Sequence, residues 1–183
     1  MNLFKKLFRR KKSKALVKET TESDSRNTSA TEQSWKHDLV VAFVQEWNNH
    51  DFESAKKLVS TDFVVVFVAA DNMELEYQDF AAEVNKIFDA FPDFAFKYES
   101  IEEQADGAVV LRNLIPHGHH TAKPYAFGPC PPIEPSGQYV ENSPETLYFH
   151  FNDSKISKQV VHAQGEMTGP PGIYTQLGGF PAL

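Results

Sequence analysis

The spacing of apolar residues changes along this 183-residue chain, from a helical repeat to a strand repeat. Leu39, Val40, Phe43, Val44 and Trp47 recur at i, i+1, i+4, i+5 and i+8, which places them on one face of an amphipathic helix of about three turns. Beyond residue 93, apolar and polar side chains mostly alternate, as they do in strands with one buried face. Helices followed by a series of strands predict an α+β fold.

Capping and turn residues set the limits of the other elements. Asp51 can cap the amino end of a second helix over 51–60, and a third helix should end before Pro92. The Pro-rich stretch 124–137 is expected to be a loop, because proline lacks the N–H donor that a central strand needs. A GPPG turn at 169–172 should lead into an irregular tail. Runs rich in β-branched and aromatic residues are expected to be strands, and these are 62–70, 73–77, 94–101, 108–116, 146–151 and 155–167.

Length and composition predict a single globular body. With 41% hydrophobic residues, 183 residues can build one sizeable core but hardly two. No window approaches the roughly 18 unbroken apolar residues of a membrane-spanning helix. Cys130 is the only cysteine, so no disulfide can form within the chain and nothing indicates an oxidising compartment. We therefore expect a cytoplasmic protein.

Charge is distributed unevenly between the beginning of the chain and the rest. Eight of the 18 Lys and Arg lie within residues 1–18, ahead of the first acidic residue, while all 25 Asp and Glu follow. The remaining chain thus carries a net charge of about −15 and should repel nucleic acid. The composition predicts three segments: a basic amphipathic tail (1–18), a polar linker (19–34) and a folded domain (35–183).

The basic tail allows three interpretations. In MNLFKKLFRRKKSK at 1–14, four large apolar residues share one helical stripe and cations occupy the rest, which suits peripheral contact with an anionic membrane surface. A disordered basic tail and an organelle transit peptide are the alternatives that the sequence leaves open. The linker ETTESDSRNTSATEQS is too poor in apolar residues to fold by itself.

Six short stretches together resemble one protein family. In order, they are FVQEWNNHDFESAKKLVSTDF at 43–63, FPDF at 91–94, GHHTA at 118–122, PSGQYV at 135–140, NDSKI at 152–156 and TQLGG at 175–179. This ordered set resembles the SnoaL-like polyketide cyclases of the nuclear transport factor two-like, cone-fold superfamily. The resemblance implies a curved antiparallel sheet wrapped around N-terminal helices, an internal apolar pocket and a homodimer.

The same resemblance implies a chemistry that needs no cofactor. In these cyclases a histidine on the GHHTA-like strand and an aspartate on the last strand move a proton during ring closure, and His120 stands at the histidine position. The family's Trp-x-x-x-Asp spacing falls here on Val160 and Gln164, neither of which can be a general base. His162 and Glu166 share a strand face with these positions by the two-residue repeat. Either could replace the aspartate if that face lines the pocket.

Four further residues are candidates for contact with a substrate, namely Trp47, Tyr125, Tyr148 and Gln164. Trp47 fits a core position by its helical spacing, and in the family's fold it could also form the floor of the pocket. Tyr125 lies on the Pro-rich loop, where an aromatic residue can serve as a lid or as a loop anchor. Tyr148 alternates with apolar neighbours, so it belongs to the more polar face of its strand.

The stretch IPHGHHTAKP at 115–124 contains three histidines within four positions. His117 and His119 share a strand face and could place two imidazoles on one metal ion. A third ligand would have to come from a distant residue such as His150, and the sequence does not place one nearby. We therefore expect no metal and assign His117 and His119 to the rim of the pocket.

Two classes of function remain. The first is a cofactor-free cyclase or isomerase, in which His120 moves a proton beside a carbonyl of a small apolar ligand. The second is a non-catalytic ligand-binding or dimerisation module on the same fold, tethered to a membrane surface by the basic tail. The absent aspartate favours the second, because fold alone does not determine function.

Overall fold

The computed structural model of the chain describes residues 34–180. The basic tail (1–18) and all of the linker except Ser34 lie outside the described residues. Within the described part, helices come first and most of the strands afterwards, which confirms the α+β prediction. None of the helices in residues 34–180 is long and apolar enough to cross a membrane. The helices are α1 (Trp35–Asn48), α2 (Phe52–Lys56), α3 (Tyr77–Ala90) and α4 (Gly169–Gln176).

The caps that the sequence predicts define the helices near the amino end of the domain. Asp51 caps α2, and its carboxylate accepts the Ser54 N–H at 2.9 Å. α2 is shorter than the predicted 51–60 because strand β1 already starts at Val59. α3 ends at Ala90, two residues before Pro92, as expected from the missing proline N–H.

Eight strands form one strongly curved sheet in the order β2-β1-β8-β7-β5-β3, with β4 and β6 also paired to β5. The prediction of a wholly antiparallel sheet needs one correction, because β1 and β8 run parallel. Between these two strands the chain forms α3 and strands β2 to β7, and β8 then returns beside β1 in the same direction. The strands are β1 (Val59–Phe67), β2 (Met73–Glu76), β3 (Ala95–Lys97), β4 (Ser100–Glu103), β5 (Val109–His119), β6 (Tyr139–Glu141), β7 (Glu145–Asn152) and β8 (Lys155–Ala163).

A bend in β5 divides the strand predicted at 94–101 into two. The register between β5 and β7 shifts between Leu111 and Leu114, and Asn113 adopts a positive φ of 51°. β4 pairs with β5 before this bend, and β3 pairs with it afterwards. One straight strand could not follow both halves of a bent partner, so the sheet curls further at this point.

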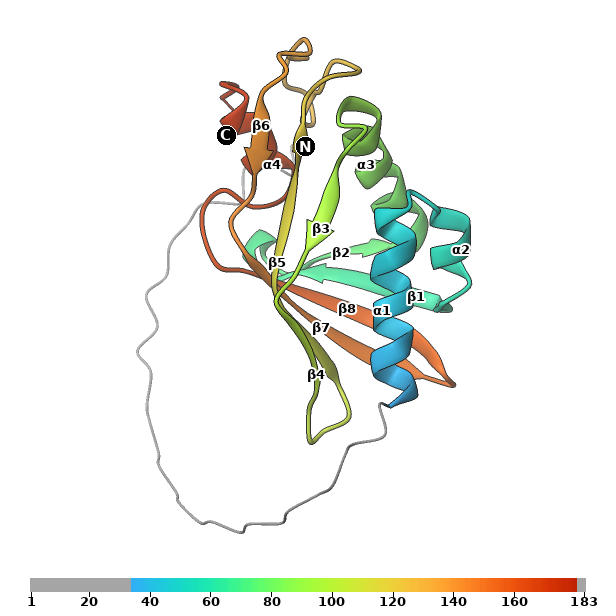
Figure 1. Cartoon of the computed structure of the whole chain (residues 1–183). Coiled ribbons are helices and arrows are strands. Elements are labelled where there is room, and N and C mark those ends of the chain that lie inside the picture. The colour runs from blue at the N-terminus through green and yellow to red at the C-terminus, as the bar shows by residue number, and fades with distance from the viewer. Residues whose placement is uncertain (1–33, 181–183) are drawn as a thin grey trace, which may run out of the picture.

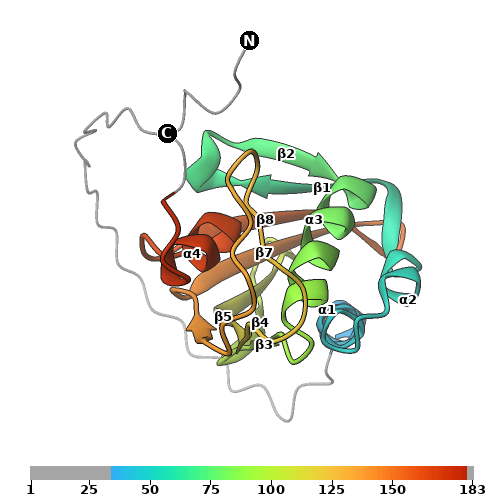
Figure 2. The ribbon, with the colours of Figure 1, turned by 90° about the horizontal axis from the view of Figure 1, so that it is seen from above.

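The core lies between α1, α3 and the concave face of the sheet. Figure 1 and Figure 2 show both helices on the same side of the curled sheet. The ring of Phe43 in α1 contacts Phe149 of β7 and Phe63 of β1, each at 6.1 Å between centroids. Phe149 is fully buried, so the residues that share its strand face point toward the helices.

The segment after β8 forms the helix α4, where an irregular tail was predicted. α4 begins with Gly169, Pro170 and Pro171, and prolines are compatible with a first helical turn because its N–H groups have no partners within the helix. Figure 1 shows α4 beside β6. The Tyr174 hydroxyl donates to the Pro131 carbonyl at 2.7 Å, which joins α4 to the Pro-rich loop. This loop and α4 together cover one end of the half-barrel.

Candidate active site

His120 is the most enclosed polar side chain of the domain. It follows directly after β5, has no exposed surface, and stacks on the ring of Phe91 at 4.9 Å between centroids. Its backbone is also fixed, since its N–H donates to the Gln138 carbonyl at 2.9 Å and its carbonyl accepts the Gly137 N–H at 2.8 Å. The end of β5 and the strand-like stretch before β6 therefore hold the imidazole in one position.

The hydrogen bonds of His120 define what its ring can do. Nε2 lies 3.0 Å from the carbonyl of Lys123, and because a carbonyl can only accept, Nε2 must carry the proton. Nδ1 is buried and has no hydrogen-bond partner among the described residues. In the neutral ring, Nδ1 therefore holds a free lone pair, which is the property of a general base.

The FPDF element predicted from the sequence positions the end of β5. Phe91 supplies the ring beneath His120, and Asp93 binds the preceding residue, His119, with both carboxylate oxygens. One oxygen accepts the His119 N–H and the other contacts its Nδ1, each at 2.7 Å. Gly118 permits this approach, because a Cβ there would lie 3.0 Å from the Phe94 backbone.

Tyr125 contacts the same ring as His120, that of Phe91, and only 2% of its surface is exposed. Its ring packs edge-on against Phe91 at 5.7 Å, and its hydroxyl donates to the Pro170 carbonyl at 3.3 Å. Burial raises the pKa of this hydroxyl, so it remains a donor at neutral pH. Tyr125 thus anchors the Pro-rich loop to α4 above the histidine.

An acid that the sequence analysis missed, Glu145, points into the same interior. It is the first residue of β7 and pairs with Leu114 on one side and Ala163 on the other. It shares the concave strand face with Leu147 and Phe149. In the sequence, Glu145 already alternates in register with Leu147 and Phe149. This pattern could have identified it as a residue of the buried strand face.

The environment of Glu145 favours its protonated form. Burial raises the pKa of the carboxyl to about 7, and the backbone N–H of Gly169 opposes this rise only in part. Gly169 precedes Pro170, the residue whose carbonyl accepts the Tyr125 hydroxyl. The first turn of α4 therefore contacts both Glu145 and Tyr125.

Two predicted site residues, Tyr148 and His162, lie on the opposite face of the sheet. Tyr148 follows the buried Leu147 and pairs with Val160, while His162 pairs with Thr146. The two side chains contact each other at 5.1 Å between ring centroids. Because alternate residues of a strand point to opposite faces, the structure separates both from His120 and the core.

Gln164 and Glu166 lie beyond the end of the last strand. β8 ends at Ala163, and both residues are exposed in the bend that follows. Gln164 donates to the Thr146 hydroxyl at 2.7 Å. The prediction that His162, Gln164 and Glu166 share one strand face required a longer strand, and the structure does not bring this set together with His120.

Trp47 occupies the aromatic part of the core. Only 4% of its surface is exposed, and its ring contacts Phe52 at 5.0 Å and Phe80 at 4.8 Å. Its indole Nε1 is buried without a hydrogen-bond partner in residues 34–180. Trp47 thus packs as a core residue at a distance of several aromatic rings from His120.

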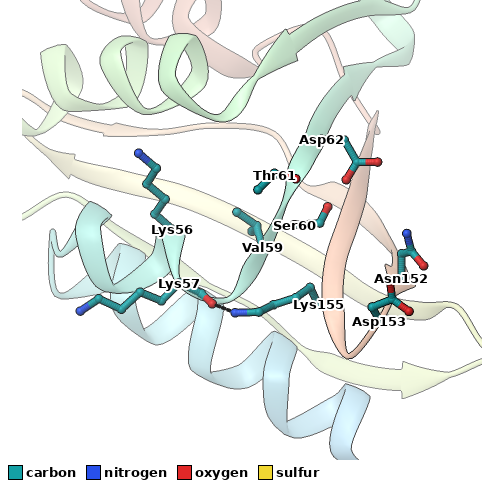
Figure 3. Close-up of a pocket in the computed structure, with 9 residues that line it drawn as sticks. All are labelled: Lys56, Lys57, Val59, Ser60, Thr61, Asp62, Asn152, Asp153 and Lys155. Carbon is teal, nitrogen blue, oxygen red and sulfur yellow. Dashed lines mark hydrogen bonds between the residues drawn. The ribbon is translucent and has the colours of Figure 1, made fainter.

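Two surface hollows lie outside this interior. One of about 570 Å³ lies where β1 begins, next to the β7–β8 turn (Figure 3). Lys155 donates there to the Lys57 carbonyl, while the amines of Lys56 and Lys57 point away from each other. Asp62 and Asp153 also line this hollow, so its charges do not converge on one ligand. The second hollow lies between the start of α1 and the β7–β8 turn, and neither includes His120.

The other two histidines of the HGHH stretch are at the surface. His119 is paired with Asp93, and its ring lies 5.0 Å from Tyr139, which also neighbours His117 at 6.1 Å. Among residues 34–180, no three His, Cys, Asp or Glu side chains are arranged to hold a metal ion. His117 and His119 therefore lie on the outer surface of β5, away from the ring of His120.

The fold and the interior define a class of protein, the α+β cone fold in which a curled sheet wraps around helices and encloses one polar end. The model of the SnoaL-like polyketide cyclase family matches residues 37–165, which is most of the described chain. The chain therefore belongs to the SnoaL-like polyketide cyclase family. No curated protein matches it.

Solved structures with the same fold are distant in sequence. AclR, a proposed hydroxylase from Streptomyces galilaeus, is 22% identical with a TM-score of 0.61, covering 81% of this chain and 83% of that one. A proposed SnoaL-like polyketide cyclase from Jannaschia sp. CCS1 is 17% identical with a TM-score of 0.58, covering 76% and 92%. IdmH, a proposed polyketide cyclase from Streptomyces antibioticus, is 19% identical with a TM-score of 0.55, covering 77% and 96%. At such identities the likeness establishes the fold alone.

Proposed function

We propose that this protein is a cofactor-independent cyclase or isomerase that acts on a small apolar carbonyl compound. The observation that carries the proposal is the free lone pair on the buried Nδ1 of His120. The Lys123 carbonyl fixes the tautomer, and Phe91 fixes the plane of the ring. A base that is held in one orientation and shielded from water suits removal of a proton beside a carbonyl.

The proposed reaction begins when a C–H hydrogen next to the carbonyl meets Nδ1. His120 takes this proton and becomes an imidazolium, which keeps its second N–H on the Lys123 carbonyl. The electron pair of the broken C–H bond forms an enolate, which then either attacks a second carbonyl to close a ring or regains a proton at another carbon. The ring of Phe91, which stacks on the imidazole, keeps water away from the enolate.

A ligand can reach His120 only if the cover over the site moves, because the imidazole has no exposed surface. Two tyrosine hydroxyls hold the Pro-rich loop to α4, because Tyr125 donates to the Pro170 carbonyl at 3.3 Å and Tyr174 donates to the Pro131 carbonyl at 2.7 Å. We propose that the Pro-rich loop and α4 separate to admit the ligand.

Deuterium exchange into a simple ketone tests the proposal without knowledge of the natural substrate. The full chain is incubated with 2-tetralone in D₂O, and uptake at the carbon beside the carbonyl is followed by proton NMR. His120→Asn keeps a donor for the Lys123 carbonyl but removes the base. We expect it to slow exchange about 100-fold, toward the buffer rate, in line with the usual contribution of a general base.

His162→Asn is the matched control, because it changes a histidine on the outer face of the same sheet. It should leave the exchange rate within about twofold of the wild type, since a group that does not contact the ligand contributes nothing to general-base catalysis. Thermal unfolding of both variants establishes that they are folded. A folded His120→Asn protein that exchanges at the wild-type rate would remove His120 from the chemistry.

A non-catalytic binding or dimerisation module is the second candidate. The observation that favours it is that Val160 and Gln164, where the family resemblance places the aspartate, carry no group that transfers a proton at neutral pH. A homodimer of this kind could form through the outer sheet face around Tyr148 and Val160. Light scattering of the full chain, compared with Val160→Lys, tests the dimer: a dimer that the lysine converts to monomer supports the dimerisation module, and a wild-type monomer excludes dimerisation as its function.

The proposed location is the cytoplasm, with peripheral contact between residues 1–14 and an anionic membrane. Each Lys or Arg near anionic lipid contributes about 1 kcal/mol, so the cluster of cations can hold the protein reversibly. Full-length protein should sediment with phosphatidylserine vesicles at low salt, and substituting Gln for Arg9, Arg10, Lys11 and Lys12 should abolish this. Equal sedimentation of the two proteins would contradict the membrane contact.

A further inference from the structure

We infer that the Pro-rich loop is a lid that opens alone, withdraws the ring of Tyr125 from Phe91, and leaves α4 and His120 in place. In the closed structure Tyr125 packs against Phe91 at 5.7 Å, and His120 stacks on the same ring at 4.9 Å. Withdrawal of Tyr125 therefore opens a space beside the ring that carries the base, and the apolar part of the ligand takes that space. The inference rests on the proposed function for what enters, but the movement itself needs no ligand to be measured.

The first support is the construction of the loop. Tyr125 and Ile133 exchange both of their backbone hydrogen bonds, at 3.0 and 2.8 Å, which ties the loop into one unit. Five of its residues are prolines, which restrict the backbone and offer no N–H to bond with a neighbouring element. Figure 2 shows the loop across the end of the half-barrel, between α3 and α4. A stiff surface unit of this kind lifts as a whole.

The second support is that the anchors at both ends of the loop also hold the backbone around His120. Ahead of the loop, the N–H groups of Thr121 and Ala122 both donate to the Ala90 carbonyl at the end of α3, at 3.2 and 3.1 Å. At its last residue, the Gly137 N–H donates to the His120 carbonyl at 2.8 Å. These bonds lie outside the part that lifts, so the loop opens without displacing the base.

The third support is that α4 is held by other bonds. The Gln176 side chain accepts the Glu141 N–H and donates to the Asn142 side chain, each at 3.0 Å. The Gln138 side chain donates to the Gln176 carbonyl at 2.6 Å, and Asn142 donates to the Gly169 carbonyl at 3.1 Å. These bonds join both ends of α4 to β6 and its neighbours, whereas tyrosine hydroxyls join the loop to α4. The loop is therefore the part that moves.

Cys130 reports the movement, because it is the only cysteine of the chain and lies in the loop with 7% of its surface exposed. Its thiolate attacks the disulfide of dithiobis(nitrobenzoate), forms a mixed disulfide and releases one coloured nitrothiobenzoate. We expect Tyr174→Phe, which removes the hydroxyl on the Pro131 carbonyl, to be labelled about fivefold faster than the wild-type full chain. Tyr77→Phe is the matched control, because it removes a similar bond, to the Phe52 carbonyl at 2.6 Å, at the opposite end of α3.

The control variant should be labelled within about twofold of the wild-type rate, because the loss of a bond far from the loop does not change a local opening. The wild-type rate should also change little in guanidinium chloride below the unfolding transition, since a local opening exposes little surface. Tyr125→Phe, which removes the other hydroxyl, should act in the same direction as Tyr174→Phe. Equal acceleration by Tyr174→Phe and Tyr77→Phe, or a rate that rises steeply with denaturant, would mean that Cys130 reacts through global unfolding and would overturn the lid.

Deuterium exchange into 2-tetralone separates this inference from the proposed function. Labelling as expected, without any exchange by the wild type, overturns the proposed function and leaves the lid. Exchange that depends on His120, together with unchanged labelling of folded Tyr174→Phe, overturns the lid alone.

Discussion

The two ends of the half-barrel interior are filled by different kinds of side chain. At one end, which we call the aromatic end, the rings of Phe43, Trp47, Phe52, Phe80 and Phe149 pack against one another, mostly edge to face. At the other, the polar end, His120, Tyr125 and Glu145 are buried beneath the Pro-rich loop and α4.

The difference separates the part of the domain that stabilises the fold from the part in which we propose that the chemistry takes place. Burial of large rings is favourable in itself, so the aromatic end stabilises the fold. The polar end buries two titratable groups, a carboxyl without a cation and an imidazole nitrogen without a partner, whereas the unpaired group at the aromatic end, the Trp47 indole N–H, does not titrate. Unfavourable groups of this kind gather where a protein binds or transforms a ligand.

The largest expected effect is at the aromatic end. Phe149→Ala removes a fully buried ring from the central strand β7, and we expect the free energy of unfolding to fall by about 3–5 kcal/mol. Tyr148→Ala, one residue earlier and on the outer face, should cost clearly less. Denaturant titration of both variants measures the contrast, and equal losses would show that the two faces contribute alike.

The second effect is at the polar end and depends on pH. Burial raises the pKa of the Glu145 carboxyl from the usual 4.5 to about 7, so this group lowers stability as the pH rises from 4.5 to 7. Glu145→Gln should therefore match the wild type near pH 4.5 and be more stable by about 3 kcal/mol at pH 8.5. Chemical denaturation at both pH values measures this, and a destabilised variant at pH 8.5 would mean that the carboxylate is stabilised by contacts beyond the Gly169 N–H.

The third effect concerns the cover of the polar end. Tyr125→Phe removes the hydroxyl that donates to the Pro170 carbonyl but keeps the ring against Phe91. We expect a loss of about 1 kcal/mol in unfolding free energy and faster hydrogen exchange of the α4 amides, measured by mass spectrometry. Unchanged exchange in α4 would show that this hydrogen bond does not hold the cover.

The smallest effect is expected for the half-exposed Asp93. Its partial burial acts to raise the pKa, but the hydrogen bonds from His119 outweigh this and lower it. The stability that this pair contributes is present at neutral pH and is lost as the pH falls through the lowered pKa. Asp93→Asn should cost less than about 1 kcal/mol at pH 7 because solvent screens the pair, and the difference should vanish in acid, as denaturation at the two pH values would show.

Much of the architecture could be predicted from local patterns. The apolar repeat of α1 and the Asp51 cap of α2 depend on residues close in the chain, and both are observed. The helix α4 was missed because GPPG indicates a turn locally. Its stability comes from contacts such as Tyr174 to Pro131, which join residues 43 positions apart.

The candidate site was only partly predictable for the same reason. His120 was found by its place in a stretch that resembles the family. Tyr148 and His162 were assigned to the interior, although a two-residue repeat states only which residues share a face and does not state which face is buried. The contact of Phe149 with α1 decides that question, and it places Glu145 inside and His162 outside.

The sequence by itself thus determined the α+β order, the Asp51 cap and the end of α3 before Pro92, because these depend on neighbours within a few residues. Only the tertiary structure decided that β1 and β8 pair in parallel, that α4 covers the polar end, and that Glu145 is a buried acid. These features follow from the packing of segments that are distant in the chain. Glu145 is buried only once those segments have come together, and this burial raises the pKa of its carboxyl.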